Sequence, residues 1–209
     1  MSETTEIKSP FPEGTSAGKA LAMLVLPQGV LVALAFFAER VTGVDPLERF
    51  SFEQQAALIG IVAAITIILL VYANRFLMPK LWAELDRQAH AIFGAAPFKL
   101  TWPIVLLLSA VAGIAEEIVF RGALQGWLDT LMPLWLAIIL QAVIFAALHP
   151  VSRAYMAYVL LIGIVLGALY AWSGNLLAPM IAHFAYDVWA LRRLYRQPVP
   201  ASGEVEADA

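Results

Sequence analysis

Long apolar stretches with almost no charged residues dominate this chain of 209 residues. A helix rises about 1.5 Å per residue, so about 20 apolar residues cross the hydrocarbon core of a bilayer. Apolar residues make up 61% of the chain and charged residues only 14%, whereas soluble domains average about 45–50% and about 25%. The composition excludes a soluble enzyme and a disordered chain. It predicts an all-α, polytopic membrane helix bundle.

Six apolar segments are candidate membrane spans, and we predict about six transmembrane helices in a single membrane-embedded domain, residues 17–196. Residues 1–16 and 197–209 are polar and contain prolines, which predicts a disordered N-terminal tail and a loose C-terminal tail. The six segments cover residues 20–38, 56–76, 102–128, 134–148, 154–172 and 176–191.

Residues 79–93 have a different pattern. Apolar side chains recur at helical spacing on one face, and charged or amide side chains occupy the other face. This pattern is typical of an amphipathic helix that lies in the headgroup region of a membrane. A cytosolic connecting helix is the alternative. The apolar positions are Leu81, Trp82, Leu85, Ala89, Ile92 and Phe93.

The distribution of charge predicts the partners and the orientation of the chain. Thirteen basic and 16 acidic residues offer no basic patch for nucleic acid, and the absence of cysteine excludes a thiolate metal site. With the N-terminus inside, ten basic residues fall on inner segments and three, Arg40, Arg49 and Arg121, on outer ones. Because basic residues favour the inner side, we expect both termini in the cytoplasm, in a bacterial inner membrane.

Few charged residues interrupt residues 101–191, and each is a candidate functional residue. Insertion of a charged side chain at the centre of a span costs about 2.5–3.5 kcal/mol. Such residues are therefore rare and usually have a function. His149 and His183 lie in the same region. The charged residues are Glu116, Glu117, Arg121, Asp129, Arg153 and Asp187.

Adjacent carboxylates at Glu116 and Glu117 form the first candidate site. Glu117 and Arg121 are four residues apart and can pair on one helix face. Glu116 points about 100° away and has no local cation, so it is suited to act as a general base. The alternative is that both carboxylates only anchor helix packing.

The histidines extend this site to two further helices. Glu116 and His149 lie about 23 and 25 Å along their helices from the turn near residues 131–133, so we expect them at matching depth. Phe145, one turn before His149, can pack beside the imidazole. Together, a carboxylate and an imidazole suit the activation of water for attack on a carbonyl.

His183 fits this depth argument less well. It lies about 13 Å past the turn at residues 173–175, so it reaches the other two only if that turn dips into the protein or the helix is displaced. Asp187 is four residues further on and shares a helix face with His183. It could orient the imidazole, or both side chains could bind a metal.

Three motifs formed by these residues resemble those of the CPBP family of intramembrane proteases, which includes the type II CAAX prenyl endopeptidases and the Abi-like proteins. The resemblance covers roughly residues 100–191, with the motifs in the family's order. They are E-E-x-x-x-R at Glu116–Arg121, F-x-x-x-H at Phe145–His149 and H-x-x-x-N/D at His183–Asp187.

The resemblance implies an intramembrane endopeptidase that hydrolyses peptide bonds. Glu116 with His149 would activate the attacking water, and Arg121 would hold Glu117. His183 and Asp187 would stabilise the oxyanion or position the substrate. Position 187 is often Asn in the family, and an ionised aspartate only accepts hydrogen bonds. Asp187 must therefore be protonated, orient His183 or bind a metal.

The family resemblance leaves the role of a metal and the substrate open. Both a metalloendopeptidase and a metal-free glutamate protease have been described, and we expect the metal-free scheme. If zinc is present, its ligands would be Glu116, His149, His183 and Asp187. The substrate would be a peptide or a membrane-protein segment, with or without a lipid modification. The alternatives are a non-catalytic membrane binding or immunity protein and a metal or proton transporter.

Overall fold

The computed structural model describes residues 10–196, and within that range it contains helices and no strands. Four helical stretches are long and apolar enough to cross a membrane: α1 (Ala17–Thr42), α2 (Gln54–Leu77), the stretch Trp102–Leu131, and α7 (Arg153–Ser173). Large apolar side chains on them are exposed, such as Leu26 on α1, and a bilayer would cover them. The predicted polytopic helical membrane protein is therefore confirmed.

The stretch Trp102–Leu131 consists of three helical parts. These are α4 (Trp102–Glu117), the π-helix η1 (Ile118–Gln125) and the short α5 (Gly126–Leu131). Helices α6 (Leu134–Ala147) and α8 (Leu177–Arg196) occupy the two remaining predicted segments. Helix α6 is apolar but has only 14 residues, fewer than the about 20 that a span needs.

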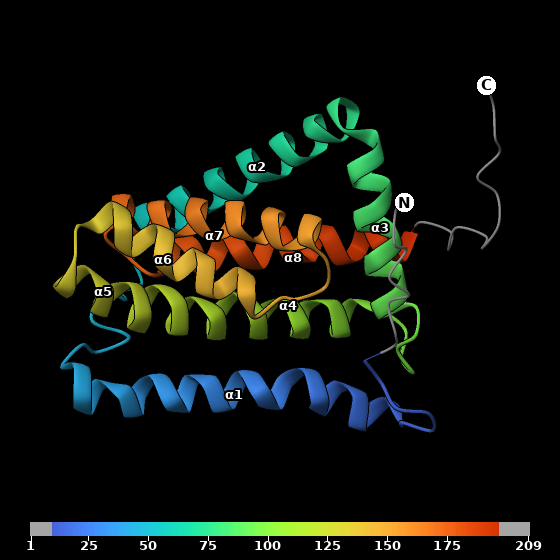
Figure 1. Ribbon diagram of the computed structural model, residues 1–209, viewed down its shortest axis with the longest axis horizontal. Helices are drawn as coiled ribbons and strands as arrows, with labels where there is room; N and C mark the ends of the chain where they lie inside the picture. The colour runs from blue at the N-terminus through green and yellow to red at the C-terminus, as the bar shows by residue number, and fades with distance from the viewer. Residues whose placement is uncertain (1–9, 197–209) are drawn as a thin grey trace.

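Helix α8 lies at the centre of the bundle, between α2 and α4 (Figure 1). Helix α1 lies along one side of the bundle, beside α4 and η1, and α6 pairs with α7. Helix α3 (Pro79–Phe93) runs across one end of the molecule. Residues from α4, α6 and α8 can therefore meet in the interior although they are distant in sequence.

Two glycines allow α8 to approach its neighbours closely. A Cβ atom on Gly60 would lie 2.6 Å from the carbonyl oxygen of Ala178, and one on Gly113 would lie 2.8 Å from the backbone nitrogen of Phe184. Any larger residue at either position would push the helices apart, and small residues at helix contacts are typical of membrane bundles. Gly113 and Phe184 lie one turn or less from Glu116 and His183, so this contact sets the spacing of the site.

The turn between α7 and α8 enters the protein at Asn175 and Leu176, after an exposed Gly174. Gly174, with φ of 66°, ends α7 in the left-handed conformation, which glycine adopts without strain. The Asn175 amide donates to the backbone oxygen of Ser51 at 3.0 Å, and the backbone nitrogen of Leu176 donates to the Arg49 oxygen at 2.6 Å. Asn175 and Leu176 are 5% and 0% exposed. The turn thus dips into the protein, as the reach of His183 requires.

The predicted N-terminal tail lies partly outside the described residues. Its described part, from residue 10 to residue 16, forms a turn in which Phe11 packs edge-on against Phe98 with ring centroids 6.2 Å apart. Ser16 then caps α1 by accepting from the backbone nitrogen of Lys19. The prediction of disorder missed this contact because a single buried aromatic in a polar segment has no periodic pattern. Residues 197–209 lie outside the described part of the chain.

Helix α3 has the predicted bounds, but its apolar face packs on protein. Trp82 and Leu85 are buried in a cluster with side chains of α2, α7 and α8. Two residues assigned to the outer polar face, Asp86 and Gln88, turn inward instead. Gln88 is 2% exposed and accepts a hydrogen bond from Ser152 at 2.9 Å. Periodicity alone could not show this, because the hydrogen-bond partners that hold Asp86 and Gln88 inward lie outside α3.

Asp86 joins α3 to two other helices. Arg193 of α8 donates to both of its carboxylate oxygens at 2.8 Å, and Arg75 of α2 donates to Oδ2 at 2.6 Å. Burial disfavours the ionised carboxylate, but the hydrogen bonds from Arg193 and Arg75 outweigh this effect and lower the pKa of Asp86 from 3.8 to about 2. The cluster therefore stabilises the folded state only while Asp86 is ionised.

We expect the stability of the protein to fall as the pH drops from about 4 to about 2. The folded pKa of Asp86 lies below its unfolded value, so its contribution is complete above pH 4 and is lost as the pH falls through the folded pKa. After allowance for solvent screening, the loss is about 1–2 kcal/mol. Thermal unfolding in detergent at pH 5 and pH 2.5 measures it. An Asp86→Asn variant should show a smaller difference between the two pH values, and an equal difference would contradict the assignment.

Candidate functional site

A cavity of about 440 Å³ opens among α1, α3, α4, α7 and α8. Most of its lining is aliphatic or aromatic, and its polar groups are few. Glu116 of α4, His149 after α6 and Asp187 of α8 all line it. Three of the predicted site residues, taken from three motifs, therefore share one cavity. Concave, largely apolar sites with a few converging polar groups are the usual form of a ligand site.

Behind this cavity, Glu117 and Arg121 form an ion pair that is completely buried. Arg121 donates to Oε1 of Glu117 at 2.7 Å, and both side chains are 0% exposed. Arg121 also donates to the backbone oxygen of Gly163 at 3.1 Å and stacks over the ring of Phe145 at 5.0 Å. The pairing follows the four-residue spacing. Oε2 of Glu117 and Nε of Arg121 are buried without a hydrogen-bond partner among the described residues, so the hydrogen bonds offset the desolvation cost of the pair only in part.

The π-helical geometry of η1 brings Arg121 into the bundle. The widened turn begins directly after Glu117 and includes Arg121, and such turns are frequent at functional sites. The prediction that Arg121 is an outer basic residue is therefore wrong, because its side chain is buried inside the protein. Gly122, in the same turn, lies so close to the backbone of Pro46 that a Cβ atom would overlap the Pro46 carbonyl.

His183 hydrogen-bonds to Glu117 rather than to Asp187. Its Nδ1 lies 2.7 Å from Oε1 of Glu117, and its Nε2 lies 3.6 Å from Asp187 and 3.9 Å from Oε2 of Glu116. A carboxylate only accepts, so Nδ1 carries the proton that points to Glu117. The orienting role that the spacing suggests for Asp187 falls to Glu117. The two residues of this contact, Glu117 and His183, are 66 positions apart in the sequence.

Glu116 is 8% exposed and has one direct hydrogen-bond partner among the described residues, Gln28 of α1. Nε2 of Gln28 donates to Oε1 of Glu116 at 2.8 Å. Glu116 has no cation within one turn of its own helix, and Gln28 was not predicted as its partner. The signal was present, because Gln28 is the only polar residue between residues 20 and 38.

Phe145 lies at the centre of an aromatic cluster beside the site. Its ring centroid lies 4.7 Å from that of His149 and 6.5 Å from that of His183. Nδ1 of His149 lies 2.7 Å from the backbone oxygen of Phe145, so Nδ1 donates and Nε2 is the acceptor of the neutral ring. The four-residue spacing between Phe145 and His149 therefore serves both ring packing and the choice of tautomer.

The predicted site residues fall into two groups by position. Glu116, His149 and Asp187 line the cavity, whereas Glu117, Arg121 and His183 lie behind the wall that these residues form. Glu116 and His149 share the cavity but form no ion pair with each other in the described part of the chain. The inner group approaches the outer one through Nε2 of His183, which lies 3.6 Å from Asp187 and 3.9 Å from Glu116.

The four residues named for a metal do not form a metal site in this arrangement. Among residues 10–196, no group of three or more His, Asp or Glu side chains is placed to hold an ion. Nδ1 of His183 is engaged by Glu117, and Nδ1 of His149 by the Phe145 carbonyl. These contacts leave Nε2 as the free nitrogen of each ring.

Two buried glutamines, Gln125 and Gln141, extend the polar interior and were not predicted. Gln141 donates to the backbone oxygen of Gly163 at 3.1 Å, the same oxygen that Arg121 uses, and Gln125 donates to the Gly167 oxygen at 3.1 Å. Both are at most 1% exposed. Their signal in the sequence is that they are amides in otherwise apolar segments. They fix α7 against η1 and α6.

All six predicted site residues lie within a segment that matches a known family model. Residues 98–189 match the family model described as type II CAAX prenyl endopeptidase Rce1-like. The chain is 38% identical over 92 residues to the uncharacterized Bacillus subtilis protein YpbD, a match that covers 43% of this chain and 44% of that protein. The alignment thus spans less than half the length of this relative. No solved structure matches.

Proposed function

We propose that the whole chain is an intramembrane endopeptidase, since residues 98–189 match the family model described as type II CAAX prenyl endopeptidase Rce1-like. The proposal rests on one observation above all: a nearly buried carboxylate, Glu116, and an imidazole, His149, line the same largely apolar cavity. A carboxylate and an imidazole that face one small space are suited to bind and deprotonate a water molecule.

In the proposed reaction, one water molecule bridges Glu116 and Nε2 of His149. The water donates one hydrogen to each acceptor, and its oxygen attacks the carbonyl carbon of the scissile peptide. Glu116 takes the proton as the new C–O bond forms. The C–N bond then breaks, and Glu116 returns the proton to the leaving nitrogen. The products are a new carboxyl terminus and a new amino terminus, and no covalent enzyme intermediate is formed.

The remaining motif residues act by position in this proposal. Arg121 holds Glu117, Glu117 orients His183 through the 2.7 Å contact, and His183 presents Nε2 toward Glu116 and Asp187. Asp187 lines the cavity, where an ionised carboxylate accepts hydrogen bonds from substrate N–H groups. We therefore regard Glu117, Arg121 and His183 as positioning residues.

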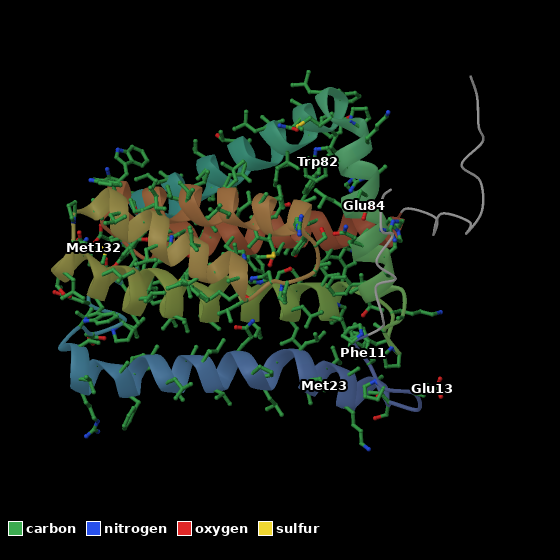
Figure 2. The ribbon with its side chains drawn as sticks, viewed as in Figure 1. Phe11, Glu13, Met23, Trp82, Glu84 and Met132 are labelled. Carbon is green, nitrogen blue, oxygen red and sulfur yellow. The ribbon has the colours of Figure 1, made fainter. Side chains whose placement is uncertain are left out.

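We propose that the site opens toward the cytoplasm. The cavity is bounded by α3 and by Arg193 near the end of α8. Figure 2 shows Trp82 and Glu84 at this end and Met132 at the opposite end. Basic residues in the α2–α3, α3–α4 and α6–α7 regions gather at the α3 end, which the positive-inside rule assigns to the cytoplasm. The apolar lining suits a peptide or membrane-protein segment, with or without a lipid modification.

The experiment that tests the proposal is cleavage of membrane-tethered peptides by the purified full-length protein in detergent. The wild type should cut at least one peptide in a library, and Glu116→Gln should cut none at a comparable rate. Glu48→Gln, which changes an exposed carboxylate in the α1–α2 loop, is the matched control and should cut like the wild type. If the wild type bound peptides without cutting any, the protein would be a non-catalytic binding or immunity protein instead.

Metal removal is a separate prediction. We expect cleavage to survive complete chelation, because the proposed step needs only protein acceptors and no group of three His, Asp or Glu side chains among residues 10–196 is placed to hold an ion. Rates are measured after dialysis against a chelator and again after zinc is added. Loss of activity with chelator and its recovery with zinc would replace this scheme by that of a metalloendopeptidase.

A further inference from the structure

Helix α1 lies outside the segment that matches the protease family, yet it reaches the proposed site. It packs along α4 and η1, and only Ala20 and Ala35 of its residues are buried. Leu24 and Gln28 nevertheless line the cavity that contains Glu116. A helix that otherwise presents apolar residues to lipid therefore delivers one amide to the site.

The placement of that amide requires a partner. Gln28 is the only polar residue in a run of 19, residues 20–38, and an amide within a membrane span is unfavourable unless it is hydrogen-bonded. Its Nε2 donates to Oε1 of Glu116 at 2.8 Å, while its own Oε1 is buried without a hydrogen-bond partner in the described residues. The interaction with Glu116 is thus what the amide is placed to make.

The two oxygens of Glu116 consequently differ. Oε1 accepts from Gln28, whereas Oε2 lies 3.9 Å from Nε2 of His183, which is too long for a hydrogen bond. No other described side chain hydrogen-bonds to this carboxylate. Without Gln28 the carboxylate could rotate about its last torsion, because such terminal torsions are broad.

We infer that Gln28 is a positioning residue of the catalytic site, which holds Oε1 of Glu116 and leaves Oε2 to take the proton from water. This inference rests on the proposed function. It extends the catalytic unit beyond residues 98–189 to a helix 88 residues away in sequence from Glu116. Because this role concerns the orientation of Glu116 and not the binding of the peptide, loss of Gln28 should slow the chemical step and leave peptide binding unchanged.

Kinetics of three Gln28 variants test the inference in the full-length protein. Gln28→Met keeps the volume and removes the donor. Gln28→Asn keeps an amide in the span but shortens the side chain by one methylene group, which moves the amide away from Glu116. Gln28→Glu replaces the donor by a second carboxylate. Each should lower kcat about 10–100-fold, the scale expected when a catalytic group is misplaced by about 1 Å, with KM within about twofold. The matched control is Leu26→Ala on the lipid-exposed face of α1, which should retain wild-type kcat.

The outcomes separate the inference from the proposed function. If the wild type cuts and Gln28→Met cuts with unchanged kcat, the inference is wrong while the protease proposal stands. A rise in KM with unchanged kcat would make Gln28 a substrate-binding residue and would also overturn the inference. If the wild type cuts nothing, both fail together. Size-exclusion chromatography and thermal unfolding establish that each variant is folded, and Gln28→Asn serves if Gln28→Met does not fold.

Discussion

Replacing Glu116 with glutamine is expected to lower kcat by about 10²–10⁴-fold, the usual contribution of a general base. The substitution keeps the side-chain volume, and its amide oxygen can still accept from Gln28, so the position of the side chain is preserved. What it removes is the ability to take a proton from water. Initial rates at several peptide concentrations give kcat and KM separately, and KM should change little.

The result distinguishes a catalytic from a structural role for Glu116. If Glu116 only anchored helix packing, Glu116→Gln would alter the melting temperature and KM together, and kcat would stay within a few-fold of the wild-type value. The same measurement on Glu48→Gln controls for loss of a carboxylate elsewhere in the chain. Full activity of Glu116→Gln would remove the basis of the proposed mechanism.

Arg121→Met is expected to destabilise the folded protein by about 3–5 kcal/mol. Arg121 and Glu117 are both 0% exposed and pair at 2.7 Å, and removing one partner of a buried ion pair leaves the other charge uncompensated. The variant also removes the donor to the Gly163 oxygen and the cation above the Phe145 ring. Thermal or denaturant unfolding in detergent measures the loss.

The double variant Glu117→Gln/Arg121→Met provides the control. It removes both charges and leaves no unpaired carboxylate, so it should be more stable than Arg121→Met alone. Since His183 would keep a hydrogen-bond acceptor at position 117, the double variant also reports on His183. A double variant that is less stable than Arg121→Met would mean that the buried charges themselves do not limit stability.

Helical segments and their membrane character could be predicted from the sequence because both depend on local composition. Every predicted apolar segment contains a helix, and the bounds of α3 agree with the periodicity of residues 79–93. The pairing of Glu117 with Arg121 was equally accessible, since a four-residue spacing brings two side chains to one face of a helix. The three motifs in order also gave the resemblance to the protease family whose model residues 98–189 match.

Contacts between helices were decided only in the tertiary structure. The His183–Glu117 hydrogen bond, the inward turn of Asp86 and the amide of Gln28 at Glu116 join residues that are between 11 and 107 positions apart in the chain. Depth along ideal helices made the reach of His183 depend on a turn that dips into the protein, and only the tertiary structure shows that Asn175 and Leu176 are buried. Local pattern therefore determined which residues are helical and which charges are unusual. Helix packing, set by close contacts such as Gly113 with Phe184, determined which of those charges meet.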